Sequence, residues 1–169
     1  MKTSLVLLLC CLVATTLACR PTGDGSTDTV PKAEKIAKMA ESKVGSTLWS
    51  FASTHKTGAN TNKCNIFVGE MIEAAGATVP HRHWWMWSPI GAAEWGSSSS
   101  SYLLSNKCWT LVSSTTDAKR GDVISDGHHV GIVTGQSLTT SASARTQNVV
   151  TNDWGFKASQ NPTIWRYTC

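Results

Sequence analysis

The sequence has little charge and, beyond its N-terminus, no long apolar run. Only 15% of its 169 residues are charged, and 15 Lys and Arg against 11 Asp and Glu leave a formal net charge of +4. This mild excess, without a run of basic residues, gives no reason to expect nucleic acid as a partner. No segment after residue 18 is long and apolar enough to cross a bilayer, so we expect no stable membrane insertion. Internal repeats are absent as well, which excludes repeat architectures.

The N-terminus has the three parts of a secretory signal peptide. Lys2 supplies positive charge, residues 4–12 are almost unbroken apolar sequence, and residues 16–18 (TLA) place small side chains where a signal peptidase cuts. We therefore expect residues 1–18 to be removed. A partial lipid-attachment box at residues 17–19 (LAC) leaves a bacterial lipoprotein signal as the alternative.

The rest of the chain has the size of one domain. Residues 19–30 are polar and contain several turn-forming residues, as flexible leaders do. Residues 31–169 suffice for a single domain with one core. We expect this domain to be a secreted, extracellular monomer.

The cysteine count predicts a disulfide. Four cysteines follow the expected signal peptide: Cys19, Cys64, Cys108 and Cys169. Cysteines in an oxidising compartment usually pair. Because Cys108 and Cys169 both stand at the ends of strand-like segments, we expect a bridge between them. Cys19 is an alternative partner of either, and Cys64 must stay free if it is to react.

Helical periodicity comes first along the chain, and strand-like segments follow. Apolar residues repeat at helical spacing over residues 31–44, and a second helix is predicted over residues 63–75 with Asn62 as its N-cap. Residues 79–105 are expected to form a long irregular stretch. Short β-prone runs then alternate with turn signals, at residues 109–112, 122–125, 130–134, 137–143, 148–151 and 163–167. This order predicts an α+β fold, with N-terminal helices packed on an antiparallel β-sheet.

A cysteine at a helix start and a histidine at a strand start form a candidate catalytic pair. Cys64 lies in the first turn of the second helix, where free N–H groups and the helix dipole favour the nucleophilic thiolate. The sequence RGDVI at residues 120–124 precedes GHHVGIV at residues 127–133, so His129 opens a strand next to the helix. Its imidazole could accept the thiol proton and later protonate a leaving amine. On position alone, Cys64 could equally be a half-cystine or a small buried side chain.

This order of motifs resembles the NlpC/P60 and CHAP superfamily of papain-like peptidoglycan hydrolases. Three further segments are similar to the second family of type VI secretion amidase effectors, namely SPIGAAEW at residues 88–95, TSAS at 140–143 and VVTNDWGF at 149–156. With its signal peptide and extra cysteines, the chain looks most like the amidase effectors that ticks acquired from bacteria. The similarity spans about residues 31–168.

The resemblance implies a papain-like NlpC/P60 (CHAP-like) fold and an antibacterial thiol hydrolase whose partner is bacterial peptidoglycan. Cys64 would attack a stem-peptide amide, with backbone N–H groups at the helix start holding the oxyanion, and water would hydrolyse the acyl-enzyme. His129 would act as general base. In the effector family the bond attacked is the cross-link between D-alanine and meso-diaminopimelate. Such chemistry uses no cofactor, and none is expected here.

Three residues compete for the role of orienting the histidine. Superfamily enzymes place a polar residue on the strand after the histidine strand, and spacing assigns Ser141 to that position. Asn152 and Asp153, from the next strand, are the alternatives, since Cys-His-Asn sites exist. Strand alternation places His128 on the opposite face from His129, so we expect His128 to be a surface or supporting residue.

The irregular stretch is rich in tryptophan: Trp84, Trp85, Trp87 and Trp95. These side chains form either a groove that stacks cell-wall sugar or peptide, or part of the core. His81 and His83 lie in the same stretch, but their spacing matches no common zinc pattern, so we expect no metal site. Two other functions stay open. One is a non-catalytic wall-binding protein with an oxidised Cys64, and the other is a hydrolase of the same fold that cuts a different amide.

Overall fold

The computed structural model describes residues 30–83 and 88–169. The expected signal peptide, the leader up to residue 29 and Trp84, Trp85 and Trp87 lie outside the described residues. Within the described ranges, no helix combines the length and the apolar character that a membrane crossing requires.

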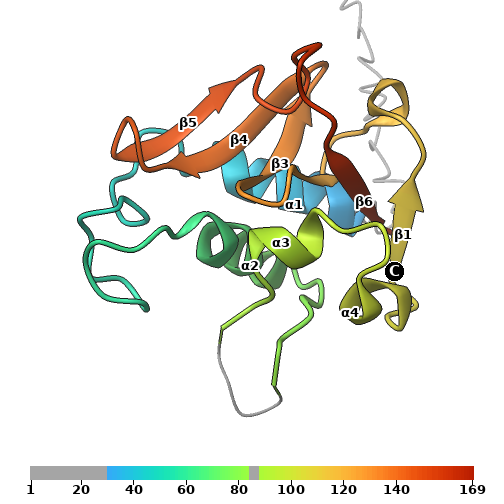
Figure 1. Cartoon of the computed structure of the whole chain (residues 1–169), viewed down its shortest axis with the longest axis horizontal. Helices are drawn as coiled ribbons and strands as arrows, with labels where there is room; N and C mark the ends of the chain where they lie inside the picture. Colours follow the sequence, from blue (N-terminus) through green and yellow to red (C-terminus); the bar gives the residue numbers. More distant parts are fainter. Residues whose placement is uncertain (1–29, 84–87) are drawn as a thin grey trace, which may run out of the picture.

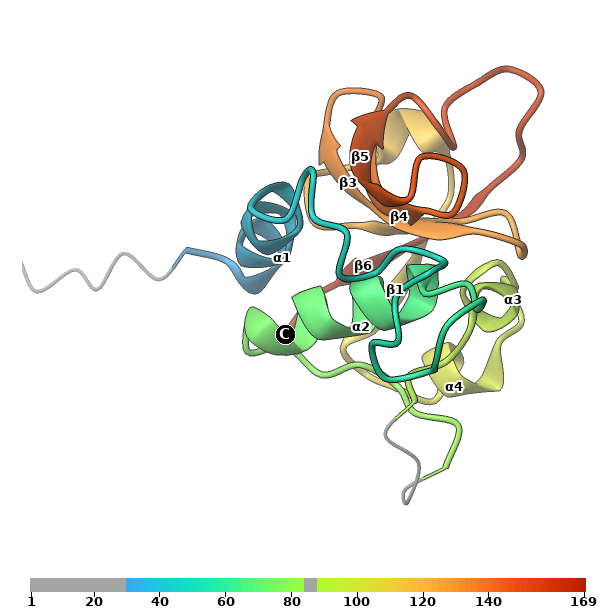
Figure 2. The same ribbon diagram turned by 90° about the vertical axis from the view of Figure 1, so that its left-hand side faces the viewer.

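In the described part of the chain, four α-helices precede the sheet. The two longer ones, α1 (Lys32–Glu41) and α2 (Cys64–Ala74), pack against each other and cover one face of the sheet (Figures 1 and 2). Two single-turn helices follow, α3 (Ala92–Trp95) and α4 (Ser101–Leu104) (Figure 1). The first contacts two inner strands of the sheet, and the second contacts an edge strand.

The described residues form one sheet of antiparallel strands. Its members are β1 (Trp109–Val112), β2 (Val123–Ser125), β3 (Val130–Gly135), β4 (Leu138–Ser143), β5 (Asn148–Asn152) and β6 (Thr163–Tyr167). Their spatial order is β1-β6-β2-β3-β4-β5, so β1 and β5 are the two edges. A 3-10 turn, Thr115–Asp117, joins β1 to β2. The predicted α+β class, with helices packed on an antiparallel sheet, is confirmed.

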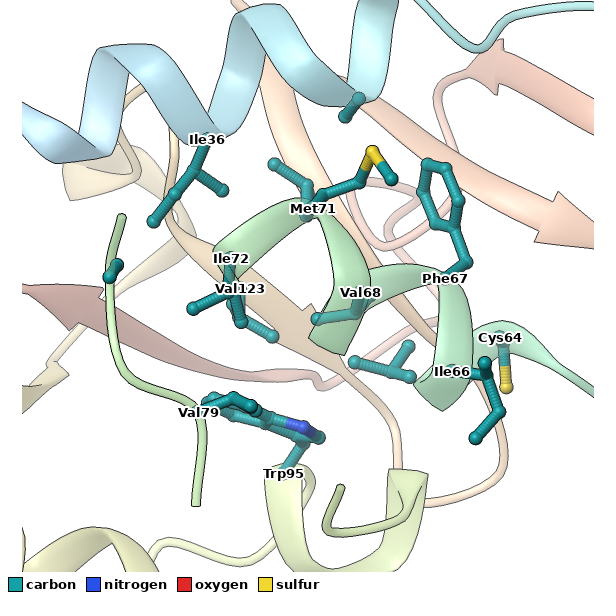
Figure 3. Packing of buried hydrophobic residues seen from close by; sticks show 14 of the residues in the cluster. Ile36, Cys64, Ile66, Phe67, Val68, Met71, Ile72, Val79, Trp95 and Val123 are labelled. Atoms are coloured by element: carbon teal, nitrogen blue, oxygen red, sulfur yellow. The ribbon is translucent and has the colours of Figure 1, made fainter. Parts of the chain in front are cut away.

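The side chains of α2 form the centre of the hydrophobic core (Figure 3). Phe67, Val68 and Ile72 are fully buried there, and Ile36 reaches them from α1. Burial of side chains of this size stabilises the fold by roughly 1.5–3 kcal/mol each. The position of α2 against the sheet is therefore firmly fixed, and with it the position of Cys64 at its first turn.

A disulfide joins Cys108 to Cys169, as the sequence predicts. It links the start of the β1 edge strand to the end of β6, across 61 residues of sequence. A loop of that length stabilises the folded chain by about 4 kcal/mol when unfolded-chain entropy is the main term. Cys64 is a free, buried thiol, whereas Cys19 lies outside the described residues.

The predicted N-cap of α2 is wrong. The N-cap position belongs to Lys63, and no side chain caps the helix there. Asn62 is exposed, while the Lys63 side chain turns inward to bond the preceding loop. A cap preference is a local signal, and here the tertiary contacts of a neighbouring lysine override it.

The predicted irregular stretch is also partly wrong, because residues 79–105 contain α3 and α4. The first of these begins where the Glu94 carboxylate accepts the backbone N–H of Gly91 and the guanidinium of Arg82. Helices of four residues contain too few apolar positions for periodicity to reveal them. They matter for the site because the end of α3 packs tightly on the turn at Gly127, where a side chain on Gly96 would collide with backbone.

Candidate active site

Cys64 is the first residue of α2 and points toward the start of β3. Its side chain belongs to the buried core cluster and is only 6% exposed. Backbone N–H groups of Val130, Asn65 and Cys64 itself act to lower the pKa of the thiol. The effect of Val130 places the sulfur near the residue that follows His129 in sequence.

His129 sits just before β3, at the end of a tight turn that several bonds hold in shape. The Asp126 carboxylate accepts the backbone N–H groups of both His128 and His129, at 2.9 and 2.8 Å. The Ser125 hydroxyl lies 2.8 Å from the His129 carbonyl oxygen and 2.8 Å from the Ala92 carbonyl oxygen of α3. The backbone that carries the imidazole is therefore braced from two sides.

One small pocket of about 70 Å³ is lined by both members of the predicted pair, Cys64 and His129. Trp49 and Phe51 contribute an aromatic wall from the loop that precedes α2, and Ala142 contributes from β4. The structure thus brings the predicted nucleophile and general base to one cavity, which the sequence places 65 residues apart. We call it the thiol pocket.

Burial keeps both groups in their neutral forms. Desolvation raises the pKa of the Cys64 thiol above its ordinary value, and the bonds from backbone N–H groups act against that rise. Desolvation likewise lowers the pKa of His129, against the opposing charge of Asp126. A neutral thiol beside a neutral imidazole can react only if the proton moves as the sulfur attacks, which is general-base catalysis.

Ser141 is the orienting candidate that contacts the histidine. Its hydroxyl oxygen lies 2.9 Å from Nε2 of His129. When Nε2 carries the proton and donates it to Ser141, Nδ1 retains a free lone pair that can accept the thiol proton. Gly131 makes this approach possible, since a Cβ there would lie 3.0 Å from the Ser141 Cβ and 2.5 Å from a Thr139 methyl.

The other two orienting candidates are engaged elsewhere. The side-chain oxygen of Asn152 accepts the backbone N–H of Trp154 at 2.9 Å, and the Asp153 carboxylate lies 3.4 Å from the Lys157 ammonium. Both Asn152 and Asp153 are exposed. The structure therefore brings Ser141, and neither of these two, into contact with His129.

Trp154 is a site residue that the sequence reasoning did not single out. Its ring meets the imidazole of His129 edge to face, with ring centroids 4.5 Å apart and an interplanar angle of 83°. The contact restricts rotation of the imidazole and shields it from water. Residues 149–156 were noticed only for their family resemblance, and a lone tryptophan after a strand gives no separate signal.

Lys63, which lines the thiol pocket, is a second residue that the sequence did not single out. Its side chain is almost completely buried, at 2% exposure, and its ammonium donates to the Gly58 carbonyl, the Thr61 carbonyl and the Thr61 hydroxyl at 2.8–3.1 Å. These bonds use all three of its protons. Lys63 therefore ties the loop at residues 58–61 to the start of α2.

Glu70, six residues after Cys64 in α2, anchors the aromatic wall of the thiol pocket. Its carboxylate accepts Trp49 Nε1 at 2.8 Å, and it lies 2.8 Å from both His55 Nε2 and Lys56 Nζ. Burial raises the pKa of Glu70, but the bonds from Lys56, His55 and Trp49 outweigh it and lower the pKa overall. Glu70 thus stays ionised and holds residues 49–56 in place.

The two adjacent histidines both line the thiol pocket. The strand-alternation argument does not apply to them, because both precede β3. His128 is exposed and His129 half-buried. Of the two, within the described residues, only His129 has a side-chain hydrogen bond to a polar group of β4. His129 keeps the role of candidate base.

Trp95 belongs to the core and not to an open groove. It is 0% exposed and packs edge to face on Trp109, with ring centroids 4.9 Å apart. Its backbone carbonyl accepts Trp165 Nε1. Trp95 is therefore a core residue, while Trp84, Trp85 and Trp87 lie outside the described residues.

Across residues 30–83 and 88–169, no cluster of three or more His, Cys, Asp or Glu side chains is arranged to hold a metal ion. His81 lies 3.3 Å from the Glu73 carboxylate. The candidate site is therefore built from Cys64, His129 and Ser141, with Trp154 against the imidazole.

Comparison with known proteins leaves this site to be interpreted from its own geometry, because no protein-family model matches the chain and no curated protein matches it.

Proposed function

We propose that this protein is a secreted cysteine hydrolase that cleaves amide bonds in the stem peptides of bacterial peptidoglycan. The observation that carries the proposal is a free thiol at the first turn of α2, in one pocket with an imidazole whose far nitrogen bonds Ser141. A helix-borne thiol facing a sheet-borne imidazole is also the arrangement that a papain-like fold of the NlpC/P60 type requires. The choice of peptidoglycan rests on the resemblance of the sequence motifs.

The reaction follows from the neutral resting pair. Nδ1 of His129 takes the proton from Cys64 as the sulfur attacks the carbonyl carbon, and the carbonyl oxygen becomes an oxyanion. In the proposed reaction, backbone N–H groups at the start of α2 stabilise that oxyanion. His129 then gives the proton to the leaving amine, the C–N bond breaks, and a thioester remains on Cys64. Water attacks the thioester with His129 as base again, releasing the acid and the free thiol.

The bond we assign is the cross-link between D-alanine and meso-diaminopimelate, as in the effector family that the motifs resemble. Cleavage there opens the wall and makes the protein antibacterial. A non-catalytic wall-binding protein is the alternative that an oxidised Cys64 would have favoured, and the free thiol removes that support.

The test is digestion of purified sacculi by the mature protein and by Cys64→Ala and Cys64→Ser, followed by mass spectrometry of the soluble fragments. The wild-type protein should convert cross-linked dimers to monomers, and both variants should leave the dimers intact while melting at the wild-type temperature. If all three proteins leave the dimers intact while Cys64 of the wild-type protein still reacts with an alkylating reagent, the protein acts on another amide substrate.

A further inference from the structure

A second pocket is lined by His129 but not by Cys64. It has a volume of about 260 Å³ and is lined by the β4–β5 hairpin and the residues just after β5. His129 and Ala144 line both this pocket and the thiol pocket, so the two cavities meet at the imidazole. We call it the hairpin pocket.

The mechanism says which part of a substrate reaches the hairpin pocket. His129 hands its proton to the leaving amine, so the amine must lie on the imidazole, while the acyl carbon lies on the sulfur. The groups attached to that amine then extend past His129, away from Cys64. The hairpin pocket is the cavity that receives them.

Arg145 is the one charged side chain among the residues lining this pocket, apart from the titratable His129. It stands at the exposed tip of the β4–β5 hairpin. In the described part of the structure its guanidinium forms no hydrogen bond or ion pair, unlike that of Arg82, Arg120 or Arg166. Its five N–H donors are therefore available to a ligand.

Two neighbouring side chains add donors of the same kind. The Asn152 side-chain oxygen accepts the Trp154 N–H, which leaves the amide NH₂ as a donor. The Ser143 hydroxyl oxygen accepts the backbone N–H of Thr146, which leaves its own proton to donate. An arginine, an amide NH₂ and a hydroxyl with spare donors form a set that suits a carboxylate.

We propose that the hairpin pocket is a carboxylate-binding subsite for the amine side of the substrate, with Arg145 as its specificity residue. This inference rests on the proposed function, and it names the chemical feature that the site recognises. In a diaminopimelate cross-link, the carbon that carries the scissile nitrogen also carries a carboxylate. A carboxylate so close to the leaving amine enters the hairpin pocket when the amine lies on His129.

The test compares two cross-linked peptide dimers that differ only at this group, one with the free carboxylate and one with the carboxamide. The wild-type protein should cleave the free acid about tenfold or more faster in kcat/KM, the size expected for one charge-assisted contact. Arg145→Ala should abolish this preference by raising KM for the acid, with kcat for the acid and kcat/KM for the carboxamide unchanged. Asn152→Asp keeps the acceptor for Trp154 but repels a carboxylate, so it should reduce the preference.

Lys107→Ala is the matched control, since it removes one exposed positive charge between α4 and the β1 edge, across the sheet from the hairpin (Figure 1). It should leave both rates at the wild-type value. Equal wild-type cleavage of the two dimers, or an equal loss on both with Arg145→Ala, would overturn the subsite while leaving the hydrolase intact.

If neither dimer is cleaved, binding separates the two proposals. The Cys64→Ala protein should bind the acid dimer at least about tenfold more tightly than the amide dimer by calorimetry, and adding Arg145→Ala should remove the difference. That result would keep the subsite and reject the hydrolase. Equal binding of both dimers would reject the subsite as well.

Discussion

The two sides of the candidate site use their polar groups in opposite ways. On the side of Cys64, the protons of Lys63 and the oxygens of Glu70 are all spent on bonds within the protein. On the side of His129, Arg145 and the Asn152 amide keep donors that nothing in the described structure uses. Charge alone does not separate these roles, because Lys63 and Arg145 are both cations that line a pocket with His129.

The difference shows how rigidity and access are divided across the site. In the proposed mechanism the nucleophile needs a fixed position shielded from water, and the bonds of Lys63 and Glu70 to the surrounding loops hold the pocket wall in place. The proposed substrate contact lies on the histidine side, where the hairpin keeps unused donors. Substitutions on the first side should therefore change stability, and substitutions on the second should change catalysis or substrate preference with stability unchanged.

The largest effect that this comparison predicts is the loss of His129. His129→Ala should lower kcat/KM by about 10²- to 10⁴-fold, because the thiol loses the base that takes its proton. The free energy of unfolding should change little, since within the described residues the imidazole bonds Ser141 and packs on Trp154. Steady-state kinetics on sacculus fragments and a thermal melt measure the two quantities. His128→Ala is the control and should remain active; an inactive His128 variant beside an active His129 variant would exchange their roles.

Lys63→Met should act on the other side, through stability. It keeps the apolar stem but removes three hydrogen bonds to the loop at residues 58–61, and a lost charged hydrogen bond costs about 1.5–3 kcal/mol. The loss is reduced to the extent that a buried charge also disappears. Urea denaturation should show a lower midpoint with an unchanged slope. Lys35→Met, at an exposed lysine of α1, should leave the midpoint in place.

The sequence predicted those parts of the structure that depend on periodicity and on spacing. Both long helices and all the strands of the sheet lie within two or three residues of their predicted bounds, and the Cys108–Cys169 bridge is present. The pair of Cys64 and His129 was found because a helix start and a strand start are both visible in a sequence. These signals are local, so a single sequence contains them.

What the sequence could not predict depends on tertiary contacts. Nothing local distinguishes Lys63 from an exposed lysine, because its burial is created by the loop that folds over it. The edge-to-face contact of Trp154 with His129 joins the end of one strand to the start of another, and spacing does not determine it. Asn62 is not the N-cap of α2; that position belongs to Lys63, whose side chain bonds the preceding loop and does not cap the helix.

Ser141→Ala should have a moderate effect confined to catalysis. Loss of one neutral hydrogen bond to Nε2 corresponds to about threefold to tenfold in kcat/KM, since the imidazole then spends less time with Nδ1 toward the thiol. Ser141→Thr should recover part of the rate, because it restores the hydroxyl. Ser143→Ala, two residues further along β4 and without a bond to His129, is the matched control on the cleavage of an amide-capped dimer. Equal losses in the Ser141 and Ser143 variants would remove the orienting role.

Asp126→Asn is expected to produce the smallest change, and it tests both sides of the site at once. The Asp126 charge raises the pKa of Cys64 and the pKa of His129, so removing it should lower both. The Asn side-chain oxygen can still accept the N–H groups of His128 and His129, so the turn should persist. The pH profile of iodoacetamide alkylation at Cys64 should move to lower pH, and the acid limb of kcat/KM, set by neutral His129, should move the same way. A profile that moves on only one limb would mean that the carboxylate acts on one group alone, and a profile that moves to higher pH would contradict the electrostatic account of the pair.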